Sequence, residues 1–258
     1  MVNKTQKIAE FLVDSHLNGK DFKNLEGSLK PSNFDEAYDA QNYFQKLISR
    51  GKLGGFKIAL SSKIQQEHHK INQPVYGGIF KKEIYQSPKS IRLSDYKRLS
   101  VEFELAFELS EQVEDLKSGK QIGEIRNYIS DVYPALELIE DRKAEYDGLD
   151  ALSLACDNAW SGGLILGKKI KNWRGLDFKN LISTCKWNNE DLKSTSVMDA
   201  DPFNNLKWIT KQLIERRKVL TKGMFIITGS VFLVRKAKAG DLIRHSLFDD
   251  LEVELEII

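Results

Sequence analysis

The alternation of apolar and polar residues is most regular between residues 101 and 109. Apolar residues occupy the odd positions there, and acidic or small residues occupy the even ones: Val101, Phe103, Leu105, Phe107 and Leu109 alternate with Glu102, Glu104, Ala106 and Glu108. A period of two residues predicts a β-strand with one apolar face. Residues 251–257 alternate in the same way, so we expect a second amphipathic strand at that end of the chain.

Helical spacing marks the first part of the chain, up to about residue 50. A helix predicted over 32–50 carries its apolar residues on one face: Ala37, Ala40, Phe44, Leu47 and Ile48. Ser32 and Asp35 have the spacing of a capping box after Pro31, and Gly51 stands where such a helix would end.

Short apolar runs separated by glycine and proline follow, and they predict a strand-rich remainder. Strands are expected at 56–60, 76–80, 91–93, 224–228 and 231–235, with a further apolar run at 135–139. Helices are expected around Ile122, Ile125 and Ile129, at 151–156, and after Asp201-Pro202 with Phe203, Leu206, Ile209 and Leu213 on the apolar face. The chain therefore belongs to the α+β class, and it shows no internal repeat.

Composition and charge narrow the functional classes. The chain has 258 residues, of which 41% are hydrophobic, enough for a core that needs no disulfide or metal to fold. Its formal charge of +2 excludes the strongly basic field of a dedicated nucleic-acid binder. Two cysteines without metal-type spacing exclude a disulfide framework. No apolar segment has the length of a membrane span, so we expect a soluble, cytoplasmic protein without membrane contact.

Three glutamates are the candidate metal ligands. Glu102 and Glu104 lie on one face of the predicted strand, about 7 Å apart along it. Carboxylate oxygens are the ligands that Mg²⁺ and Mn²⁺ prefer, although the same pattern also fits the solvated face of an ordinary amphipathic strand. Glu137 stands in an apolar run, where a charge is costly unless it binds metal or pairs with a base such as Arg142.

Three other motifs carry less weight. Gly162–Lys168 fits a P-loop spacing, but Lys169 replaces the serine or threonine that would bind magnesium. His68 and His69 are neighbours and cannot share a helix face as metal ligands. The basic triplet at 216–218 stands at a predicted helix end, where it would complement the helix dipole.

Six segments in order resemble the hydratase/decarboxylase branch of the fumarylacetoacetase superfamily. They are Gly55–Lys63, Asn72–Gly77, Val101–Phe107, Ala135–Arg142, Asp157–Gly162 and Thr228–Ser230, with Ala239–Asp241 behind them. The resemblance runs from about residue 32 to 245 and implies a mixed-sheet, barrel-like β core with a helical N-terminal region. It further implies a division into residues 1–54 and 55–258, which together form one compact unit, and assembly into homo-oligomers.

The resemblance also implies a chemistry. A divalent cation, Mg²⁺ or Mn²⁺, would be held by Glu102, Glu104 and Glu137 and would stabilise an enolate of a small 2-oxo or 2-hydroxy acid. Lys57, desolvated by apolar neighbours, would titrate low enough to move protons, or it would only pair with a glutamate. Catalytic roles fall further to Asp157 and Ser161, and substrate contacts to Ser62 and Ser230. The implied reaction is the hydration of 2-hydroxypenta-2,4-dienoate (2-keto-4-pentenoate) to 4-hydroxy-2-oxopentanoate, a step of aromatic catabolism.

Three departures from the family pattern leave rivals open. Ala59 replaces a glycine, Glu108 an apolar residue and Trp160 a small one. Trp160 either narrows the pocket, which favours a short monocarboxylate, or packs into the core. The rival reactions are decarboxylation of a 4-oxalocrotonate-type diacid and hydrolysis of an acylpyruvate, and a non-catalytic paralogue is a fourth reading.

Overall fold

The computed structural model describes residues 3–111, 113, 116, 122–248 and 251–258. Its α-helices are α1 (Lys4–Leu17), α2 (Phe34–Leu47), α3 (Lys63–His68), α4 (Ala151–Cys156) and α5 (Pro202–Glu215). Its strands are β1 (Leu53–Ala59), β2 (Val75–Phe80), β3 (Ile84–Gln86), β4 (Lys89–Ile91), β5 (Leu99–Leu109), β6 (Ile129–Glu140), β7 (Ser161–Leu166), β8 (Ile182–Trp187), β9 (Lys193–Ser196), β10 (Phe225–Ile227), β11 (Arg235–Lys236), β12 (Leu242–Phe248) and β13 (Leu251–Ile257).

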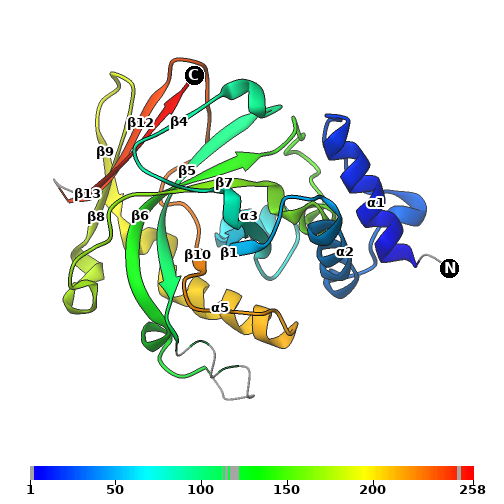
Figure 1. Ribbon diagram of the computed structural model, residues 1–258, viewed down its shortest axis with the longest axis horizontal. Helices are drawn as coiled ribbons and strands as arrows, with labels where there is room; N and C mark the ends of the chain where they lie inside the picture. Colours follow the sequence, from blue (N-terminus) through cyan, green and yellow to red (C-terminus); the bar gives the residue numbers. More distant parts are fainter. Residues whose placement is uncertain (1–2, 112, 114–115, 117–121, 249–250) are drawn as a thin grey trace.

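Two mixed β-sheets form the centre of the protein (Figure 1). The larger sheet has the order β2-β1-β10-β5-β6-β7-β3, and β11 pairs with another part of β5. The smaller sheet has the order β4-β13-β12-β8-β9. Parallel pairs such as β1–β10 stand beside antiparallel pairs such as β5–β6. The predicted α+β class with a mixed sheet is confirmed.

The larger sheet curls until its two ends meet. Strand β2, at one end of the strand order, contacts β7, near the other end. Side chains from β2, β5, β6, β7 and β10 share one buried cluster inside the curl: Ile79, Ala106, Ala135, Leu164, Leu166 and Ile227. Residues spaced by two along a strand share a face, so Glu102 and Glu104 lie on the face of Ala106, and Glu137 lies on the face of Ala135. The predicted barrel-like core is present, and the glutamates point into it.

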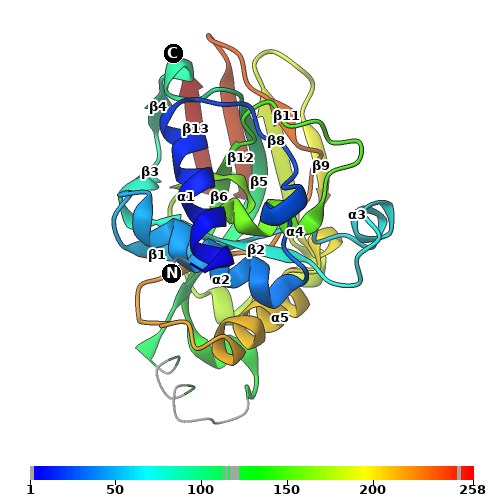
Figure 2. The same ribbon diagram turned by 90° about the vertical axis from the view of Figure 1, so that its right-hand side faces the viewer.

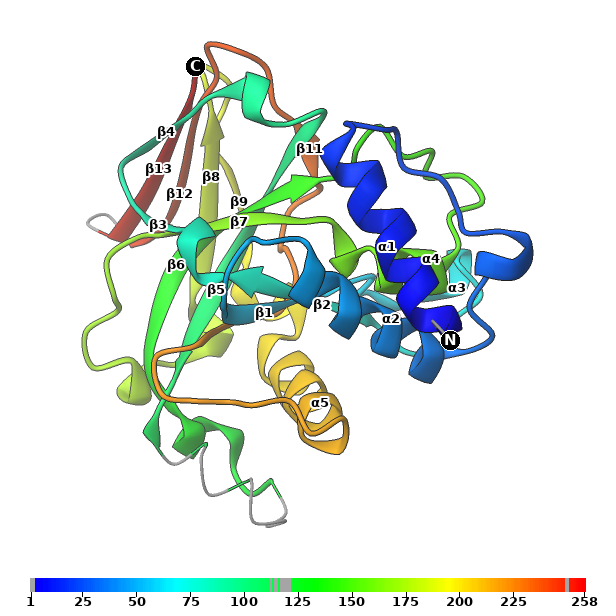
Figure 3. The same cartoon turned by 45° about the vertical axis from the view of Figure 1, so that its right-hand side comes forward.

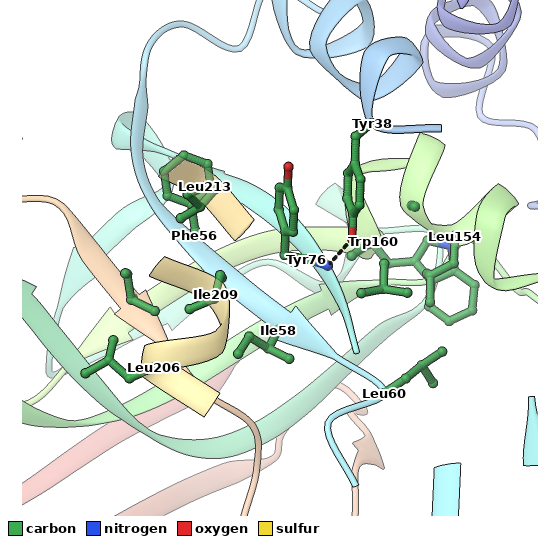
Figure 4. Packing of buried hydrophobic residues seen from close by; sticks show 14 of the residues in the cluster. Tyr38, Phe56, Ile58, Leu60, Tyr76, Leu154, Trp160, Leu206, Ile209 and Leu213 are labelled. Carbon is green, nitrogen blue, oxygen red and sulfur yellow. Dashed lines mark hydrogen bonds between the residues drawn. The ribbon is translucent and has the colours of Figure 1, made fainter. Parts of the chain in front are cut away.

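Helices cover the curled sheet from two sides. Helices α1 and α2 lie together at one side of the sheet, and α5 lies against a different part of it (Figures 2 and 3). Tyr38 of α2 stacks on Tyr76 of β2 with ring centroids 4.1 Å apart, and its hydroxyl accepts a 3.2 Å hydrogen bond from the Tyr76 amide (Figure 4). Leu206, Ile209 and Leu213 of α5 are fully buried in the same core.

One hydrophobic core joins the two ends of the chain. It contains Ile8 and Phe44 from the N-terminal helices together with Phe107 and Leu247 from the strands. Such a continuous core fits one compact unit, and the boundary between residues 54 and 55 stays a prediction. None of the helices in the described ranges is both long and apolar enough to cross a membrane.

Several expected element boundaries are wrong. Helix α2 spans Phe34–Leu47 and not 32–50. Its N-cap is Asn33 and not Ser32, because the Asn33 side chain accepts the hydrogen bond of the Glu36 amide. Residues 231–234 form no strand, and Leu233 is 88% exposed; the chain returns to the sheet at Arg235, where β11 begins. The strand expected at 91–93 ends at Ile91.

The helix expected from Ile122 to Ile129 is also wrong. Residues 125–128 form a short 3₁₀ turn, and Ile129 already begins β6. Pairing of the twelve-residue strand β6 along the whole of β5 overrides the local helical spacing of the three isoleucines.

A buried histidine links the two sheets. His245 of β12 is 1% exposed, and its Nδ1 lies 3.0 Å from the carbonyl of Ala135 in β6. That carbonyl can only accept, so Nδ1 carries the proton and Nε2 accepts the hydrogen bond of Ser183 Oγ at 2.8 Å. Burial lowers the pKa of His245 to about 4, against the carbonyl contact, which acts to raise it.

This pKa predicts an acid-labile link between the sheets. Between about pH 6.5 and pH 4, His245 is protonated in the unfolded chain and neutral in the folded chain. The free energy of unfolding therefore falls over this range by up to about 3 kcal/mol. We expect His245→Asn to lose this part of the slope, measured by urea unfolding at pH 7 and pH 4.5. The exposed His68→Asn is the control, and equal slopes in wild type and His245→Asn would contradict the assignment.

Candidate metal and substrate site

The three glutamates form one cluster on two adjacent strands. In the register of β5 and β6, Glu102 lies directly opposite Glu137, and Glu104 lies opposite Ala135. One carboxylate oxygen from each of the three lies within 4.8 Å of the other two. Glu104 and Glu137 are each 1% exposed and Glu102 is half-buried, so this part of the β5 face is not the solvated face of an ordinary amphipathic strand. The structure brings the three predicted residues together, and their role as metal ligands stays a prediction.

Lys57 completes the cluster from β1. Its side chain is 2% exposed, and its Nζ lies 2.8 Å from Glu137 Oε1. The base beside Glu137 is thus Lys57, whereas Arg142 pairs with Asp157. Only the three-residue strand β10 lies between β1 and β5 in the sheet. Lys57 pairs with Ile227, the last residue of β10.

Electrostatics in the cluster are unfavourable to three negative charges. Burial, followed by the charge of Glu137, raises the pKa of Glu102 to about 7. The same causes raise the pKa of Glu104 well above its usual value. Burial acts to lower the pKa of Lys57, but the charges of Glu137 and Glu102 outweigh it and raise that pKa. The expectation that Lys57 has a lowered pKa is therefore wrong when only the charges of the protein's own residues are counted.

The free oxygens of the cluster fit a hard divalent cation. Glu104 Oε1 and Glu137 Oε2 are buried, and neither accepts a hydrogen bond from the described residues. Buried carboxylate oxygens are costly unless a donor or a cation satisfies them. Three carboxylates against one ammonium leave a formal excess of two negative charges, which a dication balances. Oxygen-only ligands indicate Mg²⁺ or a similar ion.

The segment Gly229-Ser230 ties the cluster to a neighbouring cavity. The Gly229 amide donates a 2.8 Å hydrogen bond to Glu104 Oε2. The Ser230 hydroxyl accepts a hydrogen bond from the Phe103 amide at 3.0 Å and donates to the Phe103 carbonyl at 3.1 Å. Gly229 has φ +111°, and a Cβ on it would lie 2.4 Å from Ser61 Oγ. Only glycine fits this close approach.

Ser62 and Ser230 line the same cavity, which has a volume of about 450 Å³. Ser62 caps helix α3, where its hydroxyl and Gln65 form a capping box. The remaining wall comes mainly from the 72–74 turn and from the start of α5, including Asn204, Asn205 and Trp208. Both predicted substrate-binding residues are brought together here, and their contact with substrate stays a prediction.

Asp157 lies in a separate ion-pair network. Its carboxylate accepts from His16 of α1 at 2.6 Å and from Arg142 at 2.5 Å. Burial acts to raise the pKa of Asp157, but the positive charges of His16 and Arg142 outweigh it and lower that pKa. Both oxygens are taken, and no contact among the described residues joins Asp157 to the glutamates. The geometry gives Asp157 a structural role first, and its catalytic role stays a prediction.

Ser161 begins β7 and is buried beside Ile139. The loop before it is strained, because Asn158, Ala159 and Trp160 all have φ between +50° and +56°. Asn158 holds the loop against β2, since its Oδ1 accepts from the Gly78 amide and from Gln45 Nε2, both at 2.7 Å. The strained loop and its α2 partner left no signal in the sequence pattern.

The departures from the family pattern lie away from the cavity wall. Trp160 is 6% exposed and packs edge-on against Phe22 and Tyr146, so it belongs to the core. Glu108 accepts a 2.6 Å hydrogen bond from the Tyr133 hydroxyl. Ala59 ends β1 opposite Val75. Trp160 therefore gives no support to a narrowed pocket.

Comparison with known proteins finds hydratases and decarboxylases that are similar to this chain. It is 28% identical over 242 residues to a 2-keto-4-pentenoate hydratase from Paraburkholderia xenovorans, covering 92% of this chain and 88% of that protein. It is 23% identical to a 4-oxalocrotonate decarboxylase from Pseudomonas putida, covering 91% and 89%. The resemblance to this branch is confirmed. No family model matches the sequence.

Solved structures agree on the fold. A 4-oxalocrotonate decarboxylase from Pseudomonas putida G7, complexed with magnesium and adipate, superposes with a TM-score of 0.83 at 20% identity, over 100% of this chain and 99% of that one. A fumarylacetoacetate hydrolase family protein from Yersinia pestis superposes with a TM-score of 0.53 at 17% identity, over 79% and 91%. This chain has a fumarylacetoacetase-like fold.

The cluster predicts the outcome of removing one carboxylate. Glu104→Gln keeps the shape of the side chain and removes one ligand charge, so we expect Mg²⁺ affinity to fall by at least about tenfold in calorimetry. Glu108→Gln, on the same strand but outside the cluster, should bind as wild type does. Unchanged affinity in both Glu104→Gln and Glu137→Gln would disprove the metal site.

Proposed function

We propose that this protein is a lyase that hydrates 2-hydroxypenta-2,4-dienoate to 4-hydroxy-2-oxopentanoate. The observation that carries the proposal is the buried cluster of Glu102, Glu104, Glu137 and Lys57. It is supported by relatives that are 2-keto-4-pentenoate hydratases and match nearly the whole chain. In this proposal the cluster is the active centre, and the cavity beside Ser230 receives the substrate.

The three glutamates would hold a divalent cation, which we take to be Mg²⁺, with Mn²⁺ as the alternative. Magnesium in the decarboxylase structure and the free carboxylate oxygens of this cluster both support that choice. A bound dication supplies positive charge that stabilises an enolate of a 2-oxo acid. The Gly229 amide helps by fixing the second oxygen of Glu104.

Lys57 is the group to which we assign proton transfer. Its amine is buried beside three carboxylates, so its distance from the reacting atoms is fixed by the sheet and not by a mobile loop. Hydration requires protonation of the diene and addition of water at C4. A buried amine held beside the proposed metal ligands suits the first of these steps. Asp157 and Ser161 keep the catalytic assignment made from the resemblance.

The charge of the cavity wall favours a monocarboxylate. Asp199 and Asp201 line the cavity, and Lys63 is the single cationic residue among its lining residues. A diacid bound to the cation through one end would bring its second carboxylate near two acids and one base. The decarboxylase reading, which the 4-oxalocrotonate decarboxylase relatives support, lacks a clear cationic partner for that second carboxylate.

A role in aromatic catabolism, a cytoplasmic location and a homo-oligomeric state belong to the same proposal. They are supported by the resemblance to catabolic hydratases alone. The cluster is contained within one chain, so metal binding does not depend on assembly.

The role of Lys57 predicts a loss of turnover without a loss of fold. Lys57→Met keeps the length and apolar contacts of the stem and removes the amine, so kcat should fall by about 10²–10⁴. Lys52→Met, an exposed change at the start of the same segment, is the matched control. Normal turnover in Lys57→Met would refute the assignment, and its unfolding curve and Mg²⁺ affinity show whether the site remains intact.

The reaction itself is tested by supplying two substrates separately. With Mg²⁺ present, we expect loss of the ultraviolet absorbance of 2-hydroxypenta-2,4-dienoate and formation of 4-hydroxy-2-oxopentanoate. 4-Oxalocrotonate should be processed more slowly, because its second carboxylate meets Asp199 and Asp201. Release of CO₂ from the diacid without hydration of the dienoate would overturn the proposal in favour of the decarboxylase.

A further inference from the structure

A second pocket, outside the proposed active centre, gathers four positive charges. It has a volume of about 750 Å³ and lies between the C-terminal half of α2, the loop before β1 and the residues after α5. Its cations are Lys46, Arg216, Arg217 and Lys218, and no acidic residue lines it. It shares no lining residue with the cavity of Ser62 and Ser230.

Lys218 is the innermost of the four cations. Its Nζ donates to two neutral amide oxygens, Asn42 Oδ1 and Gln45 Oε1, the second at 3.2 Å. Gln45 is itself buried, and its Nε2 donates to Asn158 Oδ1. Burial and the nearby charges of Lys46 and Arg216 lower the pKa of Lys218 to about 8, and Asp39 opposes this change. The ammonium thus has hydrogen-bond acceptors but no carboxylate partner among the described residues.

Arg216 is a second partly buried cation of the pocket. One of its Nη atoms lies 2.7 Å from Asp35, and its guanidinium lies over the Tyr38 ring at 4.5 Å. Its Nε is buried and has no hydrogen-bond partner among the described residues. Arg217 is exposed and has no ion-pair partner in the described part of the chain.

The ends of the helices do not balance these charges. Helices α2 and α5 both end at the pocket, and each C-terminus is equivalent to about half a negative charge. Among the described residues, Asp35, Asp39 and the two helix ends supply about three negative charges against four positive ones. The dipole explanation for the 216–218 triplet therefore accounts for part of the cluster and leaves a positive excess.

We propose that this pocket binds a phosphate group. A phosphate offers several acceptor oxygens and two negative charges, which match the ammonium of Lys218 and the guanidinium of Arg217 better than a single carboxylate does. The group can come from inorganic phosphate or from a small phosphate monoester. Neither bears on the dienoate reaction, so the site is an addition to the proposed function.

The test measures phosphate binding by calorimetry in the full-length protein loaded with Mg²⁺. Inorganic phosphate should bind wild type, and Lys218→Met and Arg217→Gln should each weaken binding by about tenfold or more. Lys211→Met, an exposed lysine of α5 paired with Glu215, is the matched control and should bind as wild type does. Glycerol phosphate in a parallel titration tells a monoester site from one that accepts only the free ion.

Two outcomes would overturn the proposal. One is the absence of phosphate binding, or equal binding in wild type, Lys218→Met and Arg217→Gln. The other is loss of binding in Glu104→Gln with retention in Lys218→Met, which would place the phosphate on the metal cluster. Arg217→Gln alters an exposed side chain, so it keeps the test valid if Lys218→Met fails to fold.

Discussion

The structure depends on holding like charges together inside a closed sheet. Pairing of β5 with β6 sets Glu102 directly opposite Glu137, an arrangement that destabilises a sheet when both side chains are ionised. The charge of Lys57 offsets one of the three carboxylates. The repulsion and burial that remain raise the pKa values of Glu102 and Glu104. A bound cation would remove the unfavourable free energy of these grouped carboxylates. The cluster is therefore better explained by metal binding than by a contribution to stability.

The rest of the fold can be understood as support for that cluster. The buried apolar cluster that includes Ala106 and Ala135 fills one part of the curled sheet. The three glutamates occupy the neighbouring part of the same interior. Gly229 and Ser230 hold β5 in place through hydrogen bonds to the Glu104 side chain and the Phe103 backbone. Helix α2 supports the other wall, where Gln41 donates to the carbonyls of Tyr76 and Ala155. Gln41 therefore connects the helical region to strand β2 and to helix α4.

The sequence predicted features that depend on local residue spacing, and it missed contacts between residues that are far apart in the chain. Alternation along one strand put Glu102 and Glu104 on a common face, and a charge within an apolar run marked Glu137. Which base faces Glu137 depends on the strand order β1-β10-β5, and no local pattern gives that order. Asp157 shows the same limit, because its partner His16 lies 141 residues earlier in the chain. The lost helix at 122–129 has a similar cause, since β5 recruits Ile129 into a strand.

The preference for a monocarboxylate substrate does not depend on Trp160. A large residue at position 160 left two interpretations open, an indole that narrows the pocket or one that packs into the core. The indole packs between Phe22 and Tyr146. Support for a monocarboxylate comes instead from Asp199, which precedes α5, and from Asp201, which stands at the N-cap position of α5. Both line the cavity without a matching set of bases. Selection against a diacid by repulsion requires no close steric fit. It therefore tolerates the drift seen at Ala59 and Trp160, provided that the charge of the wall is kept.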